Sequence, residues 1–582
     1  MGEQSKGNGG QSQEISMEKR LLLAFLLMGA VLFLTPYFYQ PPQPPPQNET
    51  TEAPAQPAPE PEAPPAAEPA APEAEQAELP AGAVTAEAEE TFTIETEVYR
   101  VTFSNRGAVV TSWILKNYTD GEGKPLELVN QRAVAVVGYP FQLDFLGSAP
   151  ALDPNAGLFA VTRSDDGLGV EFRFSDGVTY YRKAFRFRQD EYICDIESEA
   201  RHQGAPLPHL LVWRGGFGDL TVPVAPKHQH TLYYSLTDDK LIVNDPDEAE
   251  DGPITVQGSF SFAGIEDAYF AAVALPGDAA SFTIRTYTDS LPYREIGAEE
   301  GQEQEMPHAG AGIGGAGLNR FPLFVGPKDL DLLKQIDPRL QQIVDFGWFS
   351  FLAKPLFLVL KWVYTNWIQN YGWAIVIVTV GINILMFPLK LTSLKSMKKM
   401  QALQPEVKRI QEKYKGISMR DPRKQKQNEE LMALYQKHGV NPMGGCLPMI
   451  LQIPFFIAFY KVLTVAIELR GADWLWVTDL SQPEHLPIRI LPVAMVISQF
   501  LMQKMTPTTA VGSSGQQRIM YMMPLMMGFI FYGVSSGLVL YWLTSNVVGV
   551  AQQLIINRMG EKVEIPAEKK PEPKPKRKGR KR

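Results

Sequence analysis

Long apolar runs constrain the fold of this 582-residue chain more than any other feature. A helix needs about 20 predominantly apolar residues to cross the hydrocarbon core of a bilayer. One uncharged run follows Lys19 and Arg20, and five more lie in the last 212 residues; they cover 21–39, 371–389, 448–467, 488–505, 519–534 and 538–556. The pattern predicts a polytopic α-helical membrane protein with six transmembrane helices.

The first run has an alternative interpretation as a cleaved signal peptide. No small-x-small cleavage site follows it, and it ends in the bulky residues Tyr37, Phe38 and Tyr39. We therefore expect an uncleaved anchor at 21–39, with residues 1–20 in the cytoplasm.

The chain between the first two runs has two different compositions. Residues 40–90 are dominated by Pro, Ala and Glu, which predicts an extended linker because this composition cannot bury a core. Residues 91–345 alternate apolar and polar side chains, as in "VEFRFSDGVTYYRKAFRFRQ", and are interrupted by Asp-Gly and Gly-Ala turn signals. This second segment predicts a large all-β sandwich.

The charge distribution predicts how the chain is oriented. Residues 40–370 carry a net charge of −25, whereas 390–447 carry +8 and 558–582 carry +7. Basic segments beside transmembrane helices remain in the cytoplasm. We expect a multi-pass membrane protein, with both termini in the cytoplasm and the β domain on the other side of the membrane.

Two amphipathic segments accompany the apolar runs. Residues 346–370 carry Lys354, Lys361, Thr365 and Gln369 on one helical face, which predicts a helix lying along the outer membrane surface; a seventh span is the alternative.

Residues 390–447 show apolar positions at three- and four-residue spacing around Pro405 and predict a basic cytoplasmic helical hairpin. The basic hairpin and the basic tail at 557–582 suit anionic lipid headgroups or ribosomal RNA.

Few residues point to catalysis or to a cofactor. The two cysteines, Cys194 and Cys446, are expected on opposite sides of the bilayer and so form no disulfide. No HExxH, GxSxG or Walker string is present, and the "GAGIGGAG" stretch lacks the strand-turn-helix context of a nucleotide site. We expect neither an enzyme nor a bound cofactor or metal.

An amide interrupts the second apolar run. Asn383 lies in "VTVGINILMFPLKL" and forms one polar stripe with Thr379 and Lys390. A buried amide without a partner costs about 1–3 kcal/mol, so it needs a partner or a task. Polar groups also lie in other runs: Gln452, Thr464, Gln499, Gln503, Tyr541, Ser545 and Gln552. They either hold helices together or have a task within the membrane.

Several strings resemble one known family. "LMALYQKHGVNPMGGCLPMILQIPFF", "IELRGADWLWVTDLS" and "SSGLVLYWLTSN", in this order and spacing, are similar to the YidC membrane-protein insertases of Gram-negative bacteria. The similarity covers nearly the whole chain. It implies a location in the bacterial inner membrane, with a β-supersandwich in the periplasm followed by a five-helix insertase core at 371–556. It also implies a chaperone and insertase function for nascent membrane proteins, alone or with the Sec translocon.

The resemblance also implies a site. In the family, a hydrophilic groove receives the polar segment of a client, and an Arg is typical at the position of Asn383. In this chain the positive charge of that Arg is therefore either removed or displaced to another residue. The groove residues implied are Thr379, Asn383, Gln499, Tyr541 and Trp542. Lys461 is the one full charge deep inside a run, and it either snorkels to the outer interface or supplies the missing cation.

Two other functions are alternatives. A polytopic transporter predicts related halves or paired charges within the membrane, and neither is visible. A membrane-anchored periplasmic assembly or binding protein would use its helices only as an anchor. The partners expected for an insertase are nascent membrane proteins, the Sec translocon, anionic lipids and the ribosome. The ribosome would bind through the basic tail and the cytoplasmic hairpin.

Overall fold

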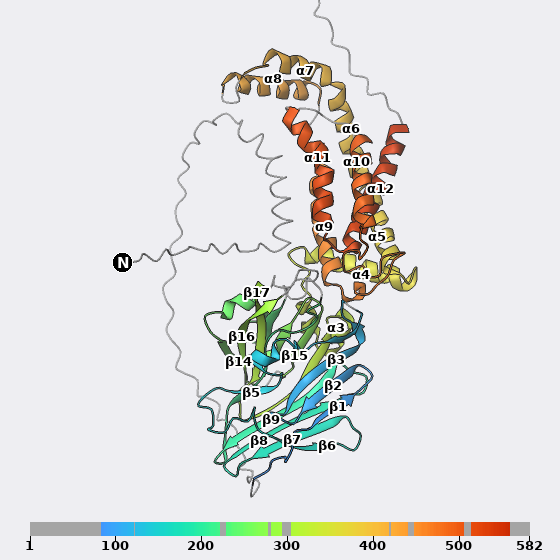
Figure 1. Cartoon of the computed structure of the whole chain (residues 1–582). Helices are drawn as coiled ribbons and strands as arrows, with labels where there is room; N and C mark the ends of the chain where they lie inside the picture. Colours follow the sequence, from blue (N-terminus) through green and yellow to red (C-terminus); the bar gives the residue numbers. More distant parts are fainter. Residues whose placement is uncertain are drawn as a thin grey trace, which may run out of the picture.

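The computed structural model describes residues 83–121, 123–221, 229–277, 281–293, 304–417, 421–439, 447–505 and 514–558. The predicted anchor, most of the linker, Cys446 and the basic tail lie outside the described residues. Figure 1 shows two stacked parts: a β domain below and a group of helices above it.

The β domain consists of two antiparallel sheets. The smaller one has the order β1-β2-β3-β4, and the larger one runs β5-β11-β17-β16-β14-β15-β18-β9-β8-β7-β6, with β10 beside β9 and the β12–β13 pair beside β14. The strands are β1 Thr91–Glu95, β2 Tyr99–Ser104, β3 Val109–Thr119, β4 Pro125–Glu127, β5 Gln142–Phe145, β6 Ala160–Arg163, β7 Gly169–Ser175, β8 Thr179–Phe187, β9 Ile193–His202, β10 Ala205–Pro206, β11 His209–Trp213, β12 His230–Ser235, β13 Lys240–Asn244, β14 Ile254–Glu266, β15 Phe270–Ala274, β16 Ser281–Tyr293, β17 Gln304–Gly314 and β18 Leu318–Pro327.

Buried and more exposed side chains alternate along the strands, and the buried ones form the core between the two sheets. In β8 every second residue from Thr179 to Phe187 is buried, as period-two patterning requires. Aromatic rings fill the interior, where Tyr99 contacts Trp113 edge-on at 5.3 Å and Phe187 at 6.1 Å. The expected all-β sandwich is confirmed.

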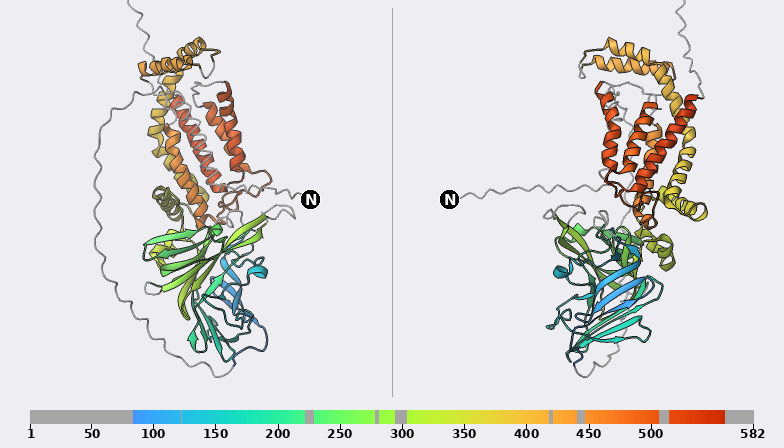
Figure 2. Two further views of the ribbon diagram at one scale, coloured as in Figure 1. Left: turned by 90° about the vertical axis from the view of Figure 1, so that its left-hand side faces the viewer. Right: turned by 45° about the vertical axis from the view of Figure 1, so that its right-hand side comes forward.

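Most of the helices follow the last strand. Within the β domain lie the short α2 Val134–Val137 and η2 Pro246–Ala249; the remaining elements are α3 Leu330–Ile336, η3 Pro338–Ile343, α4 Ser350–Asn366, α5 Tyr371–Leu385, α6 Phe387–Ala402, α7 Gln404–Lys413, α8 Arg423–Lys437, α9 Leu447–Val465, η5 Ile467–Leu469, α10 Ile490–Met505, α11 Ser514–Phe531 and α12 Ser536–Arg558. The views of Figure 2 show α9 to α12 rising from the β domain and the α7–α8 hairpin lying across their far end.

Within the described part of the chain, one helix is long and apolar enough by itself to cross a membrane, namely α12. The pair α5 and α6 passes the same test together, with a bend of 51° between its halves. Apolar segments of α9, α10 and α11 are shorter. A helical C-terminal region is therefore present, and the count of six spans stays a prediction.

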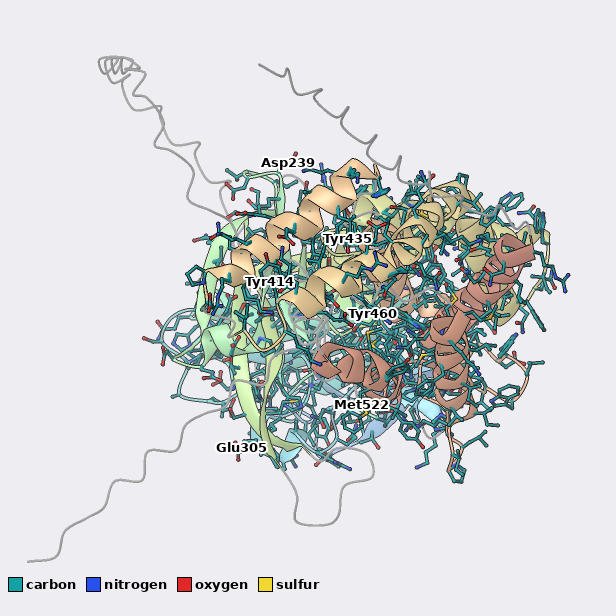
Figure 3. The ribbon with its side chains drawn as sticks, turned by 90° about the horizontal axis from the view of Figure 1, so that it is seen from above. Asp239, Glu305, Tyr414, Tyr435, Tyr460 and Met522 are labelled. Carbon is teal, nitrogen blue, oxygen red and sulfur yellow. The ribbon has the colours of Figure 1, made fainter. Side chains whose placement is uncertain are left out.

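The hairpin has the form that the spacing predicted. Helix α6 ends before Pro405 and α7 begins just ahead of it, and the apolar positions of these helices pack against α8 in a small cluster of Met400, Leu403, Val407, Leu431 and Tyr435. Figure 3, which looks down on the hairpin, shows Tyr435 between its two helices.

Helix α4 differs in detail from the expected surface helix. It ends at Asn366, so Gln369 of the predicted polar stripe lies beyond it. Lys361 bonds to the carboxylates of Asp331 at 2.6 Å and Glu468 at 3.3 Å instead of facing outward. Trp348 and Phe351 near its start are 91% and 73% exposed, so two large aromatic side chains lie on the surface there.

Buried contacts join the β domain to the helices. Arg470, which follows η5, pairs with Asp219, and their side chains are 6% and 0% exposed. The same guanidinium donates to the Thr119 carbonyl at 2.7 Å and lies over the Phe270 ring. One apolar cluster also runs from β12 and β14 into α4, α5, α9 and α12. The two parts therefore share a core.

Lys183 gives the β domain a specific pH dependence. It is 0% exposed and donates to the carbonyls of Gly107, Ala108 and Phe141 at 2.7, 3.2 and 2.7 Å. Burial lowers the pKa of Lys183 to about 7, against 10.5 in the unfolded chain. Between these values the unfolded state binds more protons, so the free energy of unfolding should rise with pH, by roughly 2 kcal/mol from pH 7 to pH 9.

The buried thiol of Cys194 can report this change in the full-length chain carrying Cys446→Ser. The urea midpoint for exposure of Cys194, read by a brief thiol-labelling pulse, should rise from pH 7 to pH 9 in the parent. The rise should be smaller in Lys183→Met and intact in Lys240→Met, which removes an exposed lysine. An equal rise in the parent and Lys183→Met would mean that Lys183 stays charged throughout.

Candidate functional site

A break between α5 and α6 shapes the site. Pro388 is the second residue of α6 and has no N–H for the carbonyl of Ile384, four residues earlier. The amide of Met386 instead bonds to the Ile382 and Ile384 carbonyls and closes α5. The helix then turns by 51°. Asn383 lies in the last turn before this break.

Asn383 is fully engaged in hydrogen bonds. Its side chain, 4% exposed, donates to the Thr379 carbonyl at 2.8 Å and to the Ser545 hydroxyl at 3.3 Å. Its Oδ1 accepts from the ammonium of Lys390 at 2.7 Å. The buried amide therefore has partners on its own helix, on α6 and on α12.

Gln552 of α12 completes the cluster. Its Nε2 donates to the backbone carbonyl of Asn383 at 3.0 Å, and its Oε1 lies 3.5 Å from the Lys390 ammonium. Tyr541, Ser545 and Gln552 are spaced by four and seven residues and so share a face of α12. These four polar residues, Asn383, Lys390, Ser545 and Gln552, are called the Asn383 cluster below.

A pocket opens beside the cluster. It is a partly open space between α5, α6, α9 and α12, of about 360 Å³ when the solvent at its mouth is included, and is lined by Ile382, Asn383, Met386, Leu389, Lys390, Gln452, Phe455 and Tyr541. The Tyr541 hydroxyl has Ser545 and Gln452 as hydrogen-bonding neighbours. The pocket therefore combines an apolar wall with amide, hydroxyl and ammonium groups, and it lies toward the hairpin end of the helices.

The structure divides the predicted groove residues into two sets. Asn383 and Tyr541 line the pocket, and Thr379 is 0% exposed, with its hydroxyl donating to the Ile375 carbonyl. Gln499 lies elsewhere, where its Oε1 accepts from Trp542 Nε1 at 3.1 Å. Gln499 and Trp542 join α10 to α12 instead of facing the pocket.

Lys461 lies at the opposite end of α9 from the pocket. Its ammonium is 3.2 Å from Asp345 Oδ2, beside the β domain. Burial alone would raise the pKa of Asp345, but the Lys461 ammonium and the Gly347 N–H hold it below its ordinary value. The cation at the pocket is thus Lys390, two turns after Asn383, and the alternative that Lys461 fills this place is wrong.

The sequence signal for the helix break was Pro388, which sequence reasoning did not use. The sequence showed polar residues at Lys390, Ser545 and Gln552. It did not show that all three contact Asn383, because this depends on how α12 is rotated against α5. Among the described residues, no group of three or more His, Cys, Asp or Glu side chains is placed to hold a metal ion.

Known proteins match the chain over nearly its whole length. The family model described as "YidC periplasmic domain" matches residues 91–359, and "60Kd inner membrane protein" matches 362–563. The membrane protein insertase YidC of Syntrophus aciditrophicus is 34% identical, with 93% of this chain and 100% of the relative covered. That of Geobacter metallireducens is also 34% identical, covering 93% and 98%.

A solved structure, described as an active YidC insertase with its first transmembrane domain resolved, is 18% identical. The match covers 81% of this chain and 93% of the other, with a TM-score of 0.34.

These matches and the fold define the class: an inner-membrane protein with a periplasmic β-sandwich domain and a helical core, which acts as an insertase and not as an enzyme. The chain belongs to the YidC family of membrane protein insertases.

Proposed function

We propose that the chain inserts nascent membrane proteins by receiving their polar segments in the pocket beside the Asn383 cluster. The observation that supports this proposal is a hydrogen-bonded set of amide, hydroxyl and ammonium groups among otherwise apolar helices. A charged residue at the centre of a span costs about 2.5–3.5 kcal/mol, whereas Leu, Ile, Phe or Val gains about 0.3–0.6 kcal/mol. Polar groups part way across the membrane lower the first cost.

The apolar segment of a client would move along the outer faces of α10 and α11. Ile497, Leu525 and Phe529 are 64%, 52% and 86% exposed. Met522 and Met526 lie among them, 60% and 52% exposed, and flexible thioethers adapt to side chains of different shapes. Lipid and client can therefore exchange on this surface without nucleotide hydrolysis.

The transporter and the anchored assembly protein receive no support from the family matches. Clients, the Sec translocon, the ribosome and anionic lipids remain the proposed partners. The hairpin supports the ribosome and anionic lipids as partners. It lies at the end of the molecule farthest from the β domain (Figure 1), and its Lys399, Lys413 and Lys415 are exposed. Residues 557–582 would add their positive charge there.

Replacing Asn383 by Leu tests the pocket. The change removes the acceptor of the Lys390 ammonium and the donor to Ser545, so insertion of a client with a polar translocated tail should fall about fivefold or more, equivalent to roughly 1 kcal/mol. The measurement is insertion into liposomes containing the purified full-length chain. Ile384→Leu, on the adjacent exposed position, is the matched control and should insert normally. Normal insertion by Asn383→Leu would show that Asn383 only joins helices.

We further propose the domain organisation and six-span topology described from the sequence, with both termini and the hairpin in the cytoplasm. In a Cys446→Ser background, a cysteine at Lys415 and one after residue 565 should react with impermeant reagents only from the cytoplasmic side. A cysteine at Leu475, which is 63% exposed, should react only from the periplasmic side. Labelling of any one from the opposite side contradicts the topology.

A further inference from the structure

The loop between α9 and α10, residues 466–489, holds the end of α12 that faces the β domain. The Leu480 carbonyl accepts from the Gly537 N–H at 2.9 Å. The Gln482 carbonyl accepts from the N–H and the hydroxyl of Ser536, each at 2.8 Å. The first N–H groups of a helix have no partner inside the helix, so these bonds fix the first turn of α12 to the loop.

The same loop contacts the starts of two more helices. The Glu484 carboxylate accepts from the Leu491 N–H at 2.8 Å, in the first turn of α10. Trp474, 7% exposed, packs on Gly372 in the first turn of α5, where an added Cβ atom would lie 2.2 Å from the indole. The loop therefore covers the ends of α5, α10 and α12, and two of these helices line the pocket.

The β domain holds this loop through two side chains. Ile467 is 4% exposed and belongs to the apolar core of the β domain. The Arg470 guanidinium donates to the Asp219 carboxylate and, at 2.7 Å, to the Thr119 carbonyl, and it lies 5.4 Å from the centre of the Phe270 ring. The loop is thus anchored in the β domain at one point and on α12 at another.

The first turns of α12 separate the loop from the pocket. Leu538, Val539 and Leu540 are at most 2% exposed. Tyr541, the next residue, already lines the pocket. A polar segment that leaves the pocket toward the side of the β domain therefore has to displace these turns or the loop that holds them.

Two features leave the loop poised to move. Among the described residues, buried Arg470 Nη1 has no hydrogen-bond partner, so release of the guanidinium to water would satisfy an N–H that the closed state leaves unpaired. Leu475, inside the turn closed by Trp474 and Val477, has a φ of 52°, a left-handed conformation that is unfavourable for residues other than Gly. Both features weaken the closed state that the ion pair stabilises.

We propose that the α9–α10 loop is the gate through which a client's polar segment leaves the pocket, and that the Arg470–Asp219 pair is its latch. Arg470 is then a positioning residue, which acts on the pocket through the loop and the first turn of α12. This inference rests on the proposed insertase function and adds the route by which the polar segment is translocated. It also gives the β domain a part in insertion, because this domain supplies one half of the latch.

A cysteine beneath the loop reports whether the gate is open. In the full-length chain with Cys446→Ser, Leu538→Cys should react slowly with an impermeant maleimide added on the periplasmic side, because this position is 0% exposed. Adding Arg470→Met should raise the labelling rate at least about tenfold, since loss of one partner of a buried ion pair strongly favours the open state. Arg470→Lys keeps the charge but not the forked geometry and should give an intermediate rate.

Two controls distinguish a released latch from general unfolding. Cys194 lies in the core of the β domain, is 0% exposed and should stay unreactive in every variant. Asp345→Asn removes the acid of another ion pair between the helices and the chain that follows the β domain, the pair with Lys461. It should leave Leu538→Cys as slow as in the parent.

A client with a long polar tail separates the gate from the pocket. Docking is measured in liposomes by the cross-link between Leu389→Cys, a position that lines the pocket, and a cysteine in the tail. Translocation is measured by protection of the tail from added protease. Arg470→Met should leave docking unchanged and raise the initial rate of translocation of the docked client, because the closed state has lost its latch.

The outcomes separate this inference from the insertase function. Slow labelling of Leu538→Cys in Arg470→Met, or equally fast labelling in Asp345→Asn or of Cys194, would overturn the latch. A joint fall of docking and translocation in Arg470→Met would show that Arg470 only supports helix packing. If the parental chain neither docked nor translocated the client, the proposed function would fail instead. Faster labelling and faster translocation with docking retained support the inference.

Discussion

The hydrogen bond between the Lys390 ammonium and the Asn383 side chain is the interaction on which the helical region depends. An amide or an ammonium among apolar helices costs several kcal/mol when it lacks a partner. Ser545 and Gln552 supply the remaining partners from α12, so α5 and α12 must pack at one rotation and one depth. The break at Pro388 brings Lys390 back toward Asn383. The hydrogen bonds around Asn383 thus shape the pocket and also fix how α5 packs against α12.

At the end of the helices beside the β domain, the buried or partly buried cations are paired with acids. Arg470 pairs with Asp219 and Lys461 with Asp345, so each of these cations has an acid from the β domain or its connection to α4. The Arg470–Asp219 pair is buried, and breaking a buried pair by removing one partner costs about 3–5 kcal/mol. The Asp345 side chain is 74% exposed, so its bond to Lys461 contributes less. These contacts fix the β domain on the helices and leave the Lys390 cation, whose partners are neutral amides, at the hairpin end. Ion pairs therefore join the two parts of the molecule at one end of the helices, and the pocket lies at the other end.

Much of this architecture follows from the sequence. Alternation in segments such as 179–187 predicted strands, and apolar runs and Pro405 predicted the helices and the bend in the hairpin. Strand order was beyond prediction, because β11 pairs with β5 and β17 across more than 60 and 90 residues, and tertiary packing decides such long-range pairing. The first anchor and the tail lie outside the described residues and remain predictions.

The site could be predicted only in part. Asn383 and Tyr541 do line one pocket, but Gln499 bonds to Trp542 because the rotation of α10 is set by its packing on α12. Neighbouring residues on a helix point about 100° apart, and here Tyr541 faces the pocket while Trp542 faces Gln499 of α10. Spacing identifies which residues share a face, and only the packed structure shows what that face meets.

The most direct test of this account is whether water reaches the pocket. Leu389 lines it, whereas Leu385, one turn earlier, is 70% exposed on the outer surface of the helices. A thiol reacts as the thiolate, which forms readily only where water is present. In membranes, with Cys446→Ser as background, an impermeant maleimide on the cytoplasmic side should label Leu389→Cys rapidly and Leu385→Cys hardly at all. Equally slow labelling of both cysteines would mean a dry pocket and would contradict the account.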